Sequence, residues 1–350
     1  MPIESPFASS IARPGHGEVV LTLLPRCTPT LTTLTFKYPL KLLTHISRYI
    51  PESSALPQTS PSVHLYILTY GGGLLPGDEI AVSITLNPQT RLVLTTPQGS
   101  NKIFRTVPKA EARDRLGIPA HEISDKSLQT LDVFIAREAA LCYLPDPNVP
   151  FKDSRYEQVQ TFIVDGTAKG NKRSSLCVLD WVTEGRSAQG EHWDFHLWRG
   201  KNEVWSLDGT GNKKLLLRDS IILDAELEDG RPEAEQPRNL IRERTGSQSI
   251  IGTLILYGPA FENLASFLMN QFTSSPRIGA RNWSSSSNAS ESLQNSKSTV
   301  TWTAARVRSG FVLVKFGAKD ADEARHWLGG FLREEGSVAR EFGPRALLCL

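Results

Sequence analysis

The sequence predicts a mainly β protein with about two α-helices in its C-terminal part. Residues 80–86 alternate apolar and polar side chains, which is the period of a half-buried strand. Similar short runs recur along the chain, and Gly, Pro and Asn separate them. Only residues 261–272 and 320–331 place apolar side chains at helical spacing. These three observations favour an all-β body over an α/β fold.

The strand segments can be assigned in order along the chain. Those predicted are residues 64–70, 80–86, 91–96, 158–164, 176–182, 192–199, 203–207, 215–223, 250–256, 300–307 and 311–316. The turn at Asn87-Pro88-Gln89 suggests that 80–86 and 91–96 are antiparallel neighbours. By the same reasoning, Gly200-Lys201-Asn202 closes a hairpin, and Ser309-Gly310 closes another.

Two helices are expected to cover the sheet. The first follows Gly258-Pro259, a suitable helix start. The second begins at Asp320, which can cap it, and Glu323 stands three residues on, as in a capping box.

Three segments have the composition of mobile insertions. Residues 107–127 are of mixed charge, residues 228–246 carry many charges and two prolines, and residues 274–298 are rich in Ser and Asn. Such segments bury too little apolar surface to offset the entropy of ordering the chain.

Composition narrows the function classes. The 350 residues carry 39 Lys and Arg against 37 Asp and Glu, a net charge of +2, which argues against a nucleic-acid-binding surface. No apolar run approaches the roughly 20 residues of a membrane helix. The first twenty residues lack the pattern of a secretory signal, so a cytoplasmic protein without membrane contact is expected.

Familiar catalytic and cofactor motifs are missing from the sequence. It contains no G-x-S-x-G, no H-E-x-x-H and no phosphate loop, because Asp78 stands where such a loop would need lysine. The four cysteines are scattered and form no metal or redox pair. His192 and His196 would lie about 13 Å apart on a strand, too far to share a metal ion.

Four blocks of unusual composition stand out in the chain. They are Tyr70-Gly71-Gly72-Gly73-Leu74-Leu75-Pro76-Gly77-Asp78, residues 95–105 (TTPQGSNKIFR), residues 143–151 (YLPDPNVPF) and residues 180–191 (DWVTEGRSAQGE). Glycines permit backbone angles closed to other residues, and the prolines of the third block stiffen an extended connection.

In this order, the blocks resemble the urease accessory proteins of the UreD (UreH) family. The match runs from Tyr38 to the last strand and helix, apart from the insertions, and Leu217-Arg218-Asp219 and residues 310–315 add weaker support. The resemblance implies a single domain over residues 1–350, with strands wound into a β-helix-like or β-sandwich-like body.

It also implies a role without catalysis. Members of this family bind apo-urease together with a UreF-type accessory protein and a UreG-type GTPase, and they help to insert nickel. Ni²⁺ passes through an internal polar route in transit, no cofactor is held stably, and GTP is used by the partner only.

By motif position, Asp78 and Glu191 are the first candidates for weak, transient Ni²⁺ ligands, and Asp146 is the third. Ser100 and Asn101 are expected to line the same route. The supporting motif consists of Gly71, Gly72, Gly73, Gly77, Pro145, Pro147 and Pro150. A cage of His or Cys would trap nickel, whereas isolated carboxylates let it move on.

Plainer structural roles compete with each of these assignments. Asp78 could cap a turn, Glu191 could be a solvated hairpin residue and Asp146 could form a turn between prolines. Two other functions also stay open at this point: a carbohydrate-active β-solenoid or β-sandwich enzyme with paired carboxylates, and a scaffold without a role in metal transfer.

Overall fold

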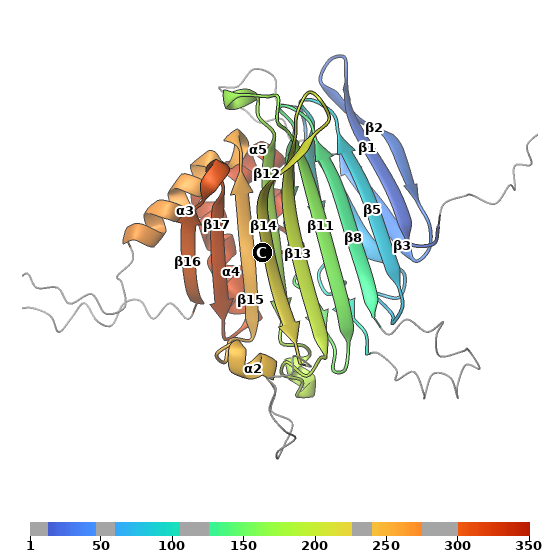
Figure 1. The fold of residues 1–350 in the computed structure, drawn as a ribbon, viewed down its shortest axis with the longest axis vertical. Helices are drawn as coiled ribbons and strands as arrows, with labels where there is room; N and C mark the ends of the chain where they lie inside the picture. The colour runs from blue at the N-terminus through green and yellow to red at the C-terminus, as the bar shows by residue number, and fades with distance from the viewer. Residues whose placement is uncertain (1–12, 47–59, 106–125, 226–239, 275–299) are drawn as a thin grey trace, which may run out of the picture.

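A computed structural model describes residues 13–46, 60–105, 126–225, 240–274 and 300–350. Two large β-sheets pack face to face, and helices cover the outer side of one of them (Figure 1). The body is therefore a sandwich with a third, helical layer. This confirms the predicted mainly β fold with two longer helices in the C-terminal part.

The seven-stranded sheet faces the viewer in Figure 1. Its strands, in spatial order, are β14 (Lys213–Asp224), β13 (Leu197–Leu207), β11 (Arg155–Asp165), β8 (Ser127–Ile135), β5 (Glu79–Leu86), β1 (His16–Leu24) and β2 (Thr28–Phe36). The strands from β13 to β1 run parallel to their neighbours, and β14 and β2 are antiparallel at the two edges.

The eight-stranded sheet lies behind it. Its strands are β16 (Val300–Arg306), β17 (Val312–Ala318), β15 (Ile250–Tyr257), β12 (Ser175–Thr183), β9 (Ala140–Tyr143), β6 (Arg91–Thr95), β4 (Val63–Thr69) and β3 (Leu40–Ile46). The four strands from β12 to β4 are parallel. A small two-stranded sheet joins β7 (Lys102–Ile103) to β10 (Val149–Pro150).

The chain winds between the two large sheets. From β4 to β13, successive long strands alternate between the eight-stranded and the seven-stranded sheet, and each turn of the winding lies parallel to the previous one. This winding makes the body β-helix-like and sandwich-like at once, as the family resemblance implied.

Four α-helices are present in the described part of the chain: α2 (Leu240–Arg244), α3 (Glu262–Ser274), α4 (Ala321–Glu335) and α5 (Ser337–Phe342). Short 3₁₀ turns lie at Gly170–Lys172, Ser187–Gln189, Pro259–Phe261, Arg308–Gly310 and Pro344–Leu347. Asp320 caps α4 as predicted, but its side chain accepts from the Asp322 amide (3.2 Å) and not from the Glu323 amide of a capping box.

Two hydrophobic cores fill the three layers. One lies between the sheets, and the other lies between the eight-stranded sheet and the helices. Central strands of the eight-stranded sheet are consequently covered on both faces, and β12 (SLCVLDWVT) is buried at every position. By contrast, β11 alternates between partly exposed and buried residues, because its outer face is open.

Two predicted strand pairings are wrong. β5 and β6 belong to different sheets, because the turn at residues 87–89 carries the chain from one sheet to the other. Residues 197–207 form one continuous strand, β13, with Gly200 in its interior. A Cβ at Gly200 would stand 2.6 Å from the Trp198 ring, so this glycine serves close packing and not a turn.

The predicted insertions fall mainly outside the described residues. This holds for 107–125, 228–239 and 275–298. The described end of the middle segment is ordered, since α2 buries Ile241 there. The pairing of β16 with β17 around Ser309-Gly310 is confirmed.

Candidate functional site

A buried carboxylate lies at the centre of the sandwich. Asp180 on β12 is 2% exposed and sits on the face that carries Val178 and Val182 in the core between the sheets. From the opposite sheet, Asn202 Nδ2 donates to Asp180 Oδ2 at 2.6 Å and Gln158 Nε2 donates to Oδ1 at 3.2 Å. Asp180 therefore joins the two sheets through hydrogen bonds inside the core between them.

Strand register extends this polar contact into two facing rows. In the eight-stranded sheet, Thr253 lies directly opposite both Asp180 and Lys315, so the three share one face. In the seven-stranded sheet, Asn202 lies beside Gln160 and opposite Asp219. We call the full set the polar band: Gln129, Tyr156, Gln158, Gln160, Asp180, Asn202, Asp219, Thr253 and Lys315.

Hydrogen bonds link one part of the polar band, and an ion pair joins two residues at its other end. At one end, Tyr156 Oη lies 3.1 Å from Gln129 Oε1 and 3.0 Å from Gln158 Oε1. At the other end, Lys315 Nζ donates to Asp219 Oδ1 at 2.6 Å. Hydrogen bonds thus link groups from Gln129 on β8 to Asn202 on β13, and an ion pair follows at the β14–β17 side.

Burial raises the pKa values of two groups in the polar band, Asp180 and Tyr156. It raises the pKa of Asp180 to about 6, although hydrogen bonds from Asn202 and Gln158 favour the carboxylate. Asp219 raises this pKa further, and Lys315 lowers it. Burial also raises the pKa of the Tyr156 phenol, which stays neutral. At neutral pH, Asp180 is mostly ionised while remaining close to its titration range.

Several oxygen atoms of the polar band have spare hydrogen-bonding capacity. Gln160 Oε1, Asn202 Oδ1, Asp219 Oδ2 and Thr253 Oγ1 are buried and have no hydrogen-bond partner among the described residues. A buried acceptor without a partner costs about 1–3 kcal/mol. Four such atoms in one layer are acceptors that bound water would satisfy.

A small pocket opens at the Gln129 end of the polar band. Its polar lining includes Thr96, Ser100, Asn101, Gln129 and Asn148. The apolar lining consists of Ile67, Leu68, Leu74, Ile80 and Ile103. Two residues predicted from sequence, Ser100 and Asn101, are thus brought together at this pocket. Gln129 lines the pocket and also belongs to the polar band, so it connects the two.

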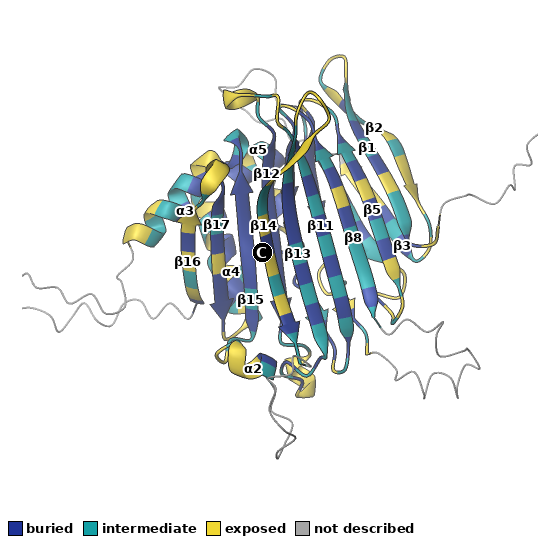
Figure 2. Ribbon diagram, in the orientation of Figure 1, coloured by how far each residue is buried: buried dark blue, intermediate teal, exposed yellow. Residues whose placement is uncertain are grey.

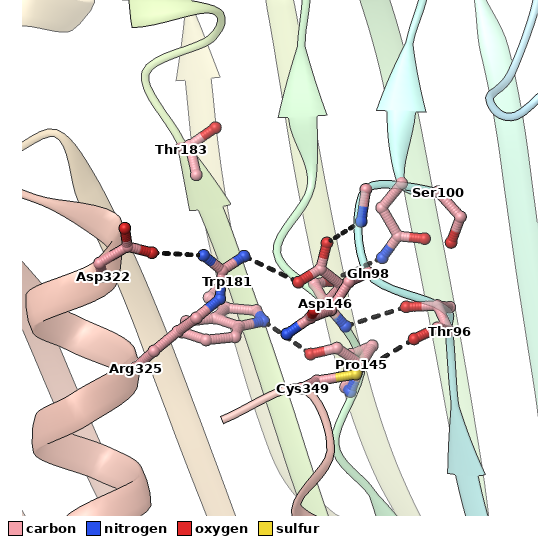
Figure 3. Close-up of polar contacts among 12 residues, drawn as sticks. Thr96, Gln98, Ser100, Pro145, Asp146, Trp181, Thr183, Asp322, Arg325 and Cys349 are labelled. Atoms are coloured by element: carbon pink, nitrogen blue, oxygen red, sulfur yellow. Dashed lines mark hydrogen bonds and ion pairs between the residues drawn. The ribbon is translucent and has the colours of Figure 1, made fainter.

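Asp146 forms hydrogen bonds with the loop at residues 97–101, which lines part of this pocket (Figure 3). Its Oδ2 accepts from Gly99 N at 2.7 Å, and its main-chain oxygen accepts from Asn101 Nδ2 at 2.6 Å. Its own amide donates to Thr96 Oγ1 at 2.9 Å. Asp146 is 1% exposed, so a fully buried residue orders the loop that carries Ser100 and Asn101.

The helical layer contacts Asp146 through Arg325 on α4. Arg325 on α4 donates from Nη2 to Asp146 Oδ1 at 2.8 Å and from Nη1 to Asp322 at 2.9 Å. Trp181 lies near the guanidinium, 6.0 Å from ring centroid to Cζ, and its Nε1 donates to Pro145 O at 3.0 Å. The buried Cys349 thiol donates to Thr96 O at 3.1 Å (Figure 3).

Asp78 lies at a turn instead of in the interior. Its Oδ2 accepts from Leu75 N at 2.8 Å, and partial burial raises its pKa. It is not among the residues that line the pocket. Gly71, Gly72 and Gly77 nearby have positive φ angles of 95°, 74° and 84°.

Gly73 has a different role in the same segment. A Cβ there would stand 2.6 Å from the Lys102 carbonyl oxygen, and the main chain of Leu74 pairs with Lys102 and Phe104. The glycine block therefore shapes the backbone beside the pocket.

Glu191 is buried but held by an arginine. Arg186 pairs with both of its carboxylate oxygens, and Lys152 N donates to Oε2 at 3.2 Å. The bonds from Arg186 lower the pKa of Glu191. Arg186 also stacks 3.9 Å from the Phe151 ring centroid. Like Asp78, Glu191 is not a lining residue of the pocket, so its role in metal transit stays a prediction.

The predicted prolines flank these sites. Pro145 and Pro147 enclose Asp146 and are buried, and Pro150 belongs to β10. They fix the extended path that brings Asp146 to the loop at residues 97–101.

The described residues contain no cluster of three or more His, Cys, Asp or Glu that could hold a metal ion. His192 contacts Glu184 (2.9 Å), and His196 lies 3.7 Å from Asp153, so the two histidines do not form a shared site. The polar band contains oxygen acceptors but no imidazole or thiol. Such a set binds a borderline metal more weakly than imidazole or thiolate.

Sequence reasoning missed Asp180 and its partners. A signal for it existed: a carboxylate in the middle of the apolar run of β12 is unusual, and Gln158 and Gln160 occupy alternating positions that point inward. No signal in sequence shows that these strands face each other.

The described helices include none that is long and apolar enough to cross a membrane.

Comparison with known proteins assigns the chain to a family. Residues 15–344 match the family model described as UreD urease accessory protein. An uncharacterized urease accessory protein ureD-like of Schizosaccharomyces pombe (strain 972) is 31% identical over 301 residues, covering 85% of this chain and 87% of the relative. Urease accessory protein D of Arabidopsis thaliana is 31% identical over 235 residues, or 67% and 65% of the two chains. Urease accessory protein 4 of Cryptococcus neoformans is 28% identical over 264 residues, 73% of each.

Proposed function

Because the chain belongs to the UreD family of urease accessory proteins, we propose that it is a non-catalytic maturation factor that passes Ni²⁺ to apo-urease along the polar band. The family assignment supports a role in urease maturation. The polar band supports the route, because a layer of amide, hydroxyl and carboxylate groups lies in the core and meets a pocket at Gln129.

The chemistry of the polar band suits transit more than storage. Its donors are oxygen atoms, and four of them lack protein partners among the described residues. A divalent cation that keeps most of its water could exchange one or two waters for these oxygens and then leave. Asp180 supplies the negative charge at the centre, and Lys315 limits the total charge at the far side.

Partners complete the proposed activity. We expect the chain to act in the cytoplasm with apo-urease, a UreF-type accessory protein and a UreG-type GTPase. GTP is used by the GTPase, since this chain has no phosphate loop. The nickel ion is cargo, and no resident cofactor is needed.

Nickel analysis of urease tests this proposal. Urease purified from cells that lack the chain should be present but without nickel, and expression of the chain should restore the metal. Nickel-loaded urease in the absence of the chain would refute the maturation role.

The route is tested separately with Asp180→Asn. This substitution keeps the size of the side chain and removes its charge, so nickel per urease should fall at least fivefold while the chain still co-purifies with urease. Asp132→Asn, an exposed carboxylate on β8, is the matched control and should load nickel normally. Normal loading with Asp180→Asn would exclude the polar band. Asp78→Ala and Glu191→Ala in the same assay test the two predicted carboxylates.

A further inference from the structure

The edge strand β2 is protected in its first half only. Pro29 and a bulge at Thr32 interrupt that half, whereas Thr33–Phe36 pair regularly with β1. It closes one side of the seven-stranded sheet and, among the strands that the structure describes, pairs only with β1. Its sequence, TPTLTTLTF, contains five threonines and no charged residue over nine positions. An open strand edge presents main-chain donors and acceptors to any extended chain that approaches.

The other three edges are guarded in recognisable ways. β14 carries five charged residues, namely Lys213, Lys214, Arg218, Asp219 and Asp224. β16 is covered by α3, where the Phe272 and Trp302 rings lie 5.2 Å apart and Glu262 pairs with Arg306. β3 carries Lys41 and His45. Charges and covering helices prevent edge-to-edge pairing, so the regular, uncharged edge at Thr33–Phe36 of β2 is an exception within the described fold.

Apolar side chains accompany the open edge. Leu34 lies directly opposite the core residue Val19, which places it on the inner face of the sheet, and Phe36 lies opposite Gly17 on the same face. Leu34 and Phe36 are nevertheless 36% and 41% exposed, because no strand of the described residues lies beyond β2. Figure 2 shows mostly exposed and half-buried residues along this strand. An added strand could cover both side chains with alternate apolar residues of its own.

The charges at the ends of β2 define the partner further. Arg26 precedes the strand and Lys37 follows it directly, whereas the strand itself is neutral. A complementary segment is therefore neutral and partly apolar in its middle and acidic at its ends. A second copy of β2 would instead bring basic ends of its own to this edge.

We propose that β2 is a docking site at which an extended, acid-flanked segment of a partner protein adds an eighth strand to the seven-stranded sheet. The proposal rests on the proposed function for the choice of partner, which is urease or another accessory protein. Affinity comes from main-chain hydrogen bonds along the edge, and specificity comes from the contact with Leu34 and Phe36.

Amide hydrogen exchange tests the proposal directly. The full chain is compared alone and in its co-purified complex with nickel-free urease and accessory proteins. Alternate amides of β2 should exchange at least tenfold more slowly in the complex, while those of the guarded edge β14 stay unchanged. Unchanged exchange in β2 within an intact complex would refute the docking site and leave the proposed function standing. If no complex with urease or accessory proteins forms, the proposed function itself fails.

Edge charges provide the matched variants. Thr33→Glu places a carboxylate in the neutral middle of the edge, opposite Val20 on the outer face of the sheet, and should weaken complex formation at least tenfold. Ser220→Glu on β14, opposite Lys201, is the control and should bind normally. Equal binding by both variants would refute the proposal. Protection of β2 that rises with the concentration of the isolated chain would also refute it, because the occupant would then be a second copy.

Discussion

Arg325 and Asp146 form an ion pair across 179 positions of sequence, and this pair connects the helical layer to the pocket wall. The Asp146 side chain is 2% exposed, and that of Arg325 is 24% exposed. Asp146 also accepts from Gly99, so the arginine stabilises the carboxylate that orders the loop at residues 97–101.

Arg325→Ala is therefore expected to lower the free energy of unfolding by roughly 2–3 kcal/mol. It leaves the buried Asp146 carboxylate without its counter-charge, and breaking such a pair costs more than losing a surface contact. Urea denaturation at pH 7 measures the effect. Arg306→Ala, which breaks the exposed pair with Glu262, is the control and should cost at most about 1 kcal/mol. Equal losses for the two variants would contradict the assigned role of Asp146.

The pKa of Asp180 predicts a specific pH dependence of stability. Its folded pKa of about 6 lies above the ordinary value of 3.8, so the folded state binds the proton more tightly than the unfolded state. The contribution of this group to stability is therefore fully present below pH 4. It is lost as the pH rises towards 6, by on the order of 2–3 kcal/mol, and is constant above that pH.

Denaturation of the wild type and of Asp180→Asn between pH 4 and pH 8 isolates this effect. The variant cannot titrate at position 180, so its stability relative to the wild type should increase from pH 4 to pH 6 and then level off. Asp132→Asn controls for the substitution itself. If the difference in unfolding free energy between wild type and Asp180→Asn does not change with pH, the raised pKa of the buried Asp180 carboxylate is contradicted.

Gly200→Ala should disturb the polar band, because Gly200 lies on β13, the strand that carries Asn202. The added methyl group would stand 2.6 Å from the Trp198 ring and 3.0 Å from Asp180 Oδ2, and overpacking of this kind costs about 1–3 kcal/mol. Gly330→Ala on α4 is the opposite case, because a Cβ there meets nothing within 4 Å. It should stabilise the protein by up to about 1 kcal/mol. The melting temperature should thus fall for Gly200→Ala and rise for Gly330→Ala, and an unchanged or higher melting temperature of Gly200→Ala would show that Gly200 is not tightly packed.

The limits of prediction from this sequence are physical. Alternation in β5 and apolar runs in β15 report burial on one or both faces, so the strands themselves could be predicted. A turn such as residues 87–89 has the same sequence pattern whether it closes a hairpin or carries the chain to the other sheet. The pairing of β5 and β6 with their neighbours could therefore not be predicted. Asp146 was predicted as a candidate, but its partner Arg325 lies too far along the chain for any local pattern to identify.

Thiol reactivity should separate one cysteine from the other three. Cys142, Cys177 and Cys349 are buried, and only Cys27 is partly accessible. A hydrogen bond with Cys142, together with burial, raises the pKa of Cys177, and burial raises that of Cys349, so neither supplies thiolate readily. One thiol per native chain should react rapidly with an aromatic disulfide, and Cys27→Ser should abolish this phase. Rapid reaction of two or more thiols would show that the cores open easily.

Gln129→Leu tests whether the pocket and the polar band form one route. The substitution preserves most of the volume but removes the group that lines the pocket and contacts Tyr156. If Ni²⁺ passes from the pocket to Asp180, nickel per urease should fall severalfold while binding of the chain to urease is unchanged. Thr130→Val, the next residue on β8 and on the outer face, is the matched control and should not alter loading. Loss of nickel with Asp180→Asn but not with Gln129→Leu would place the entrance elsewhere along the band, because a cation entering at this pocket must pass the Gln129 amide first.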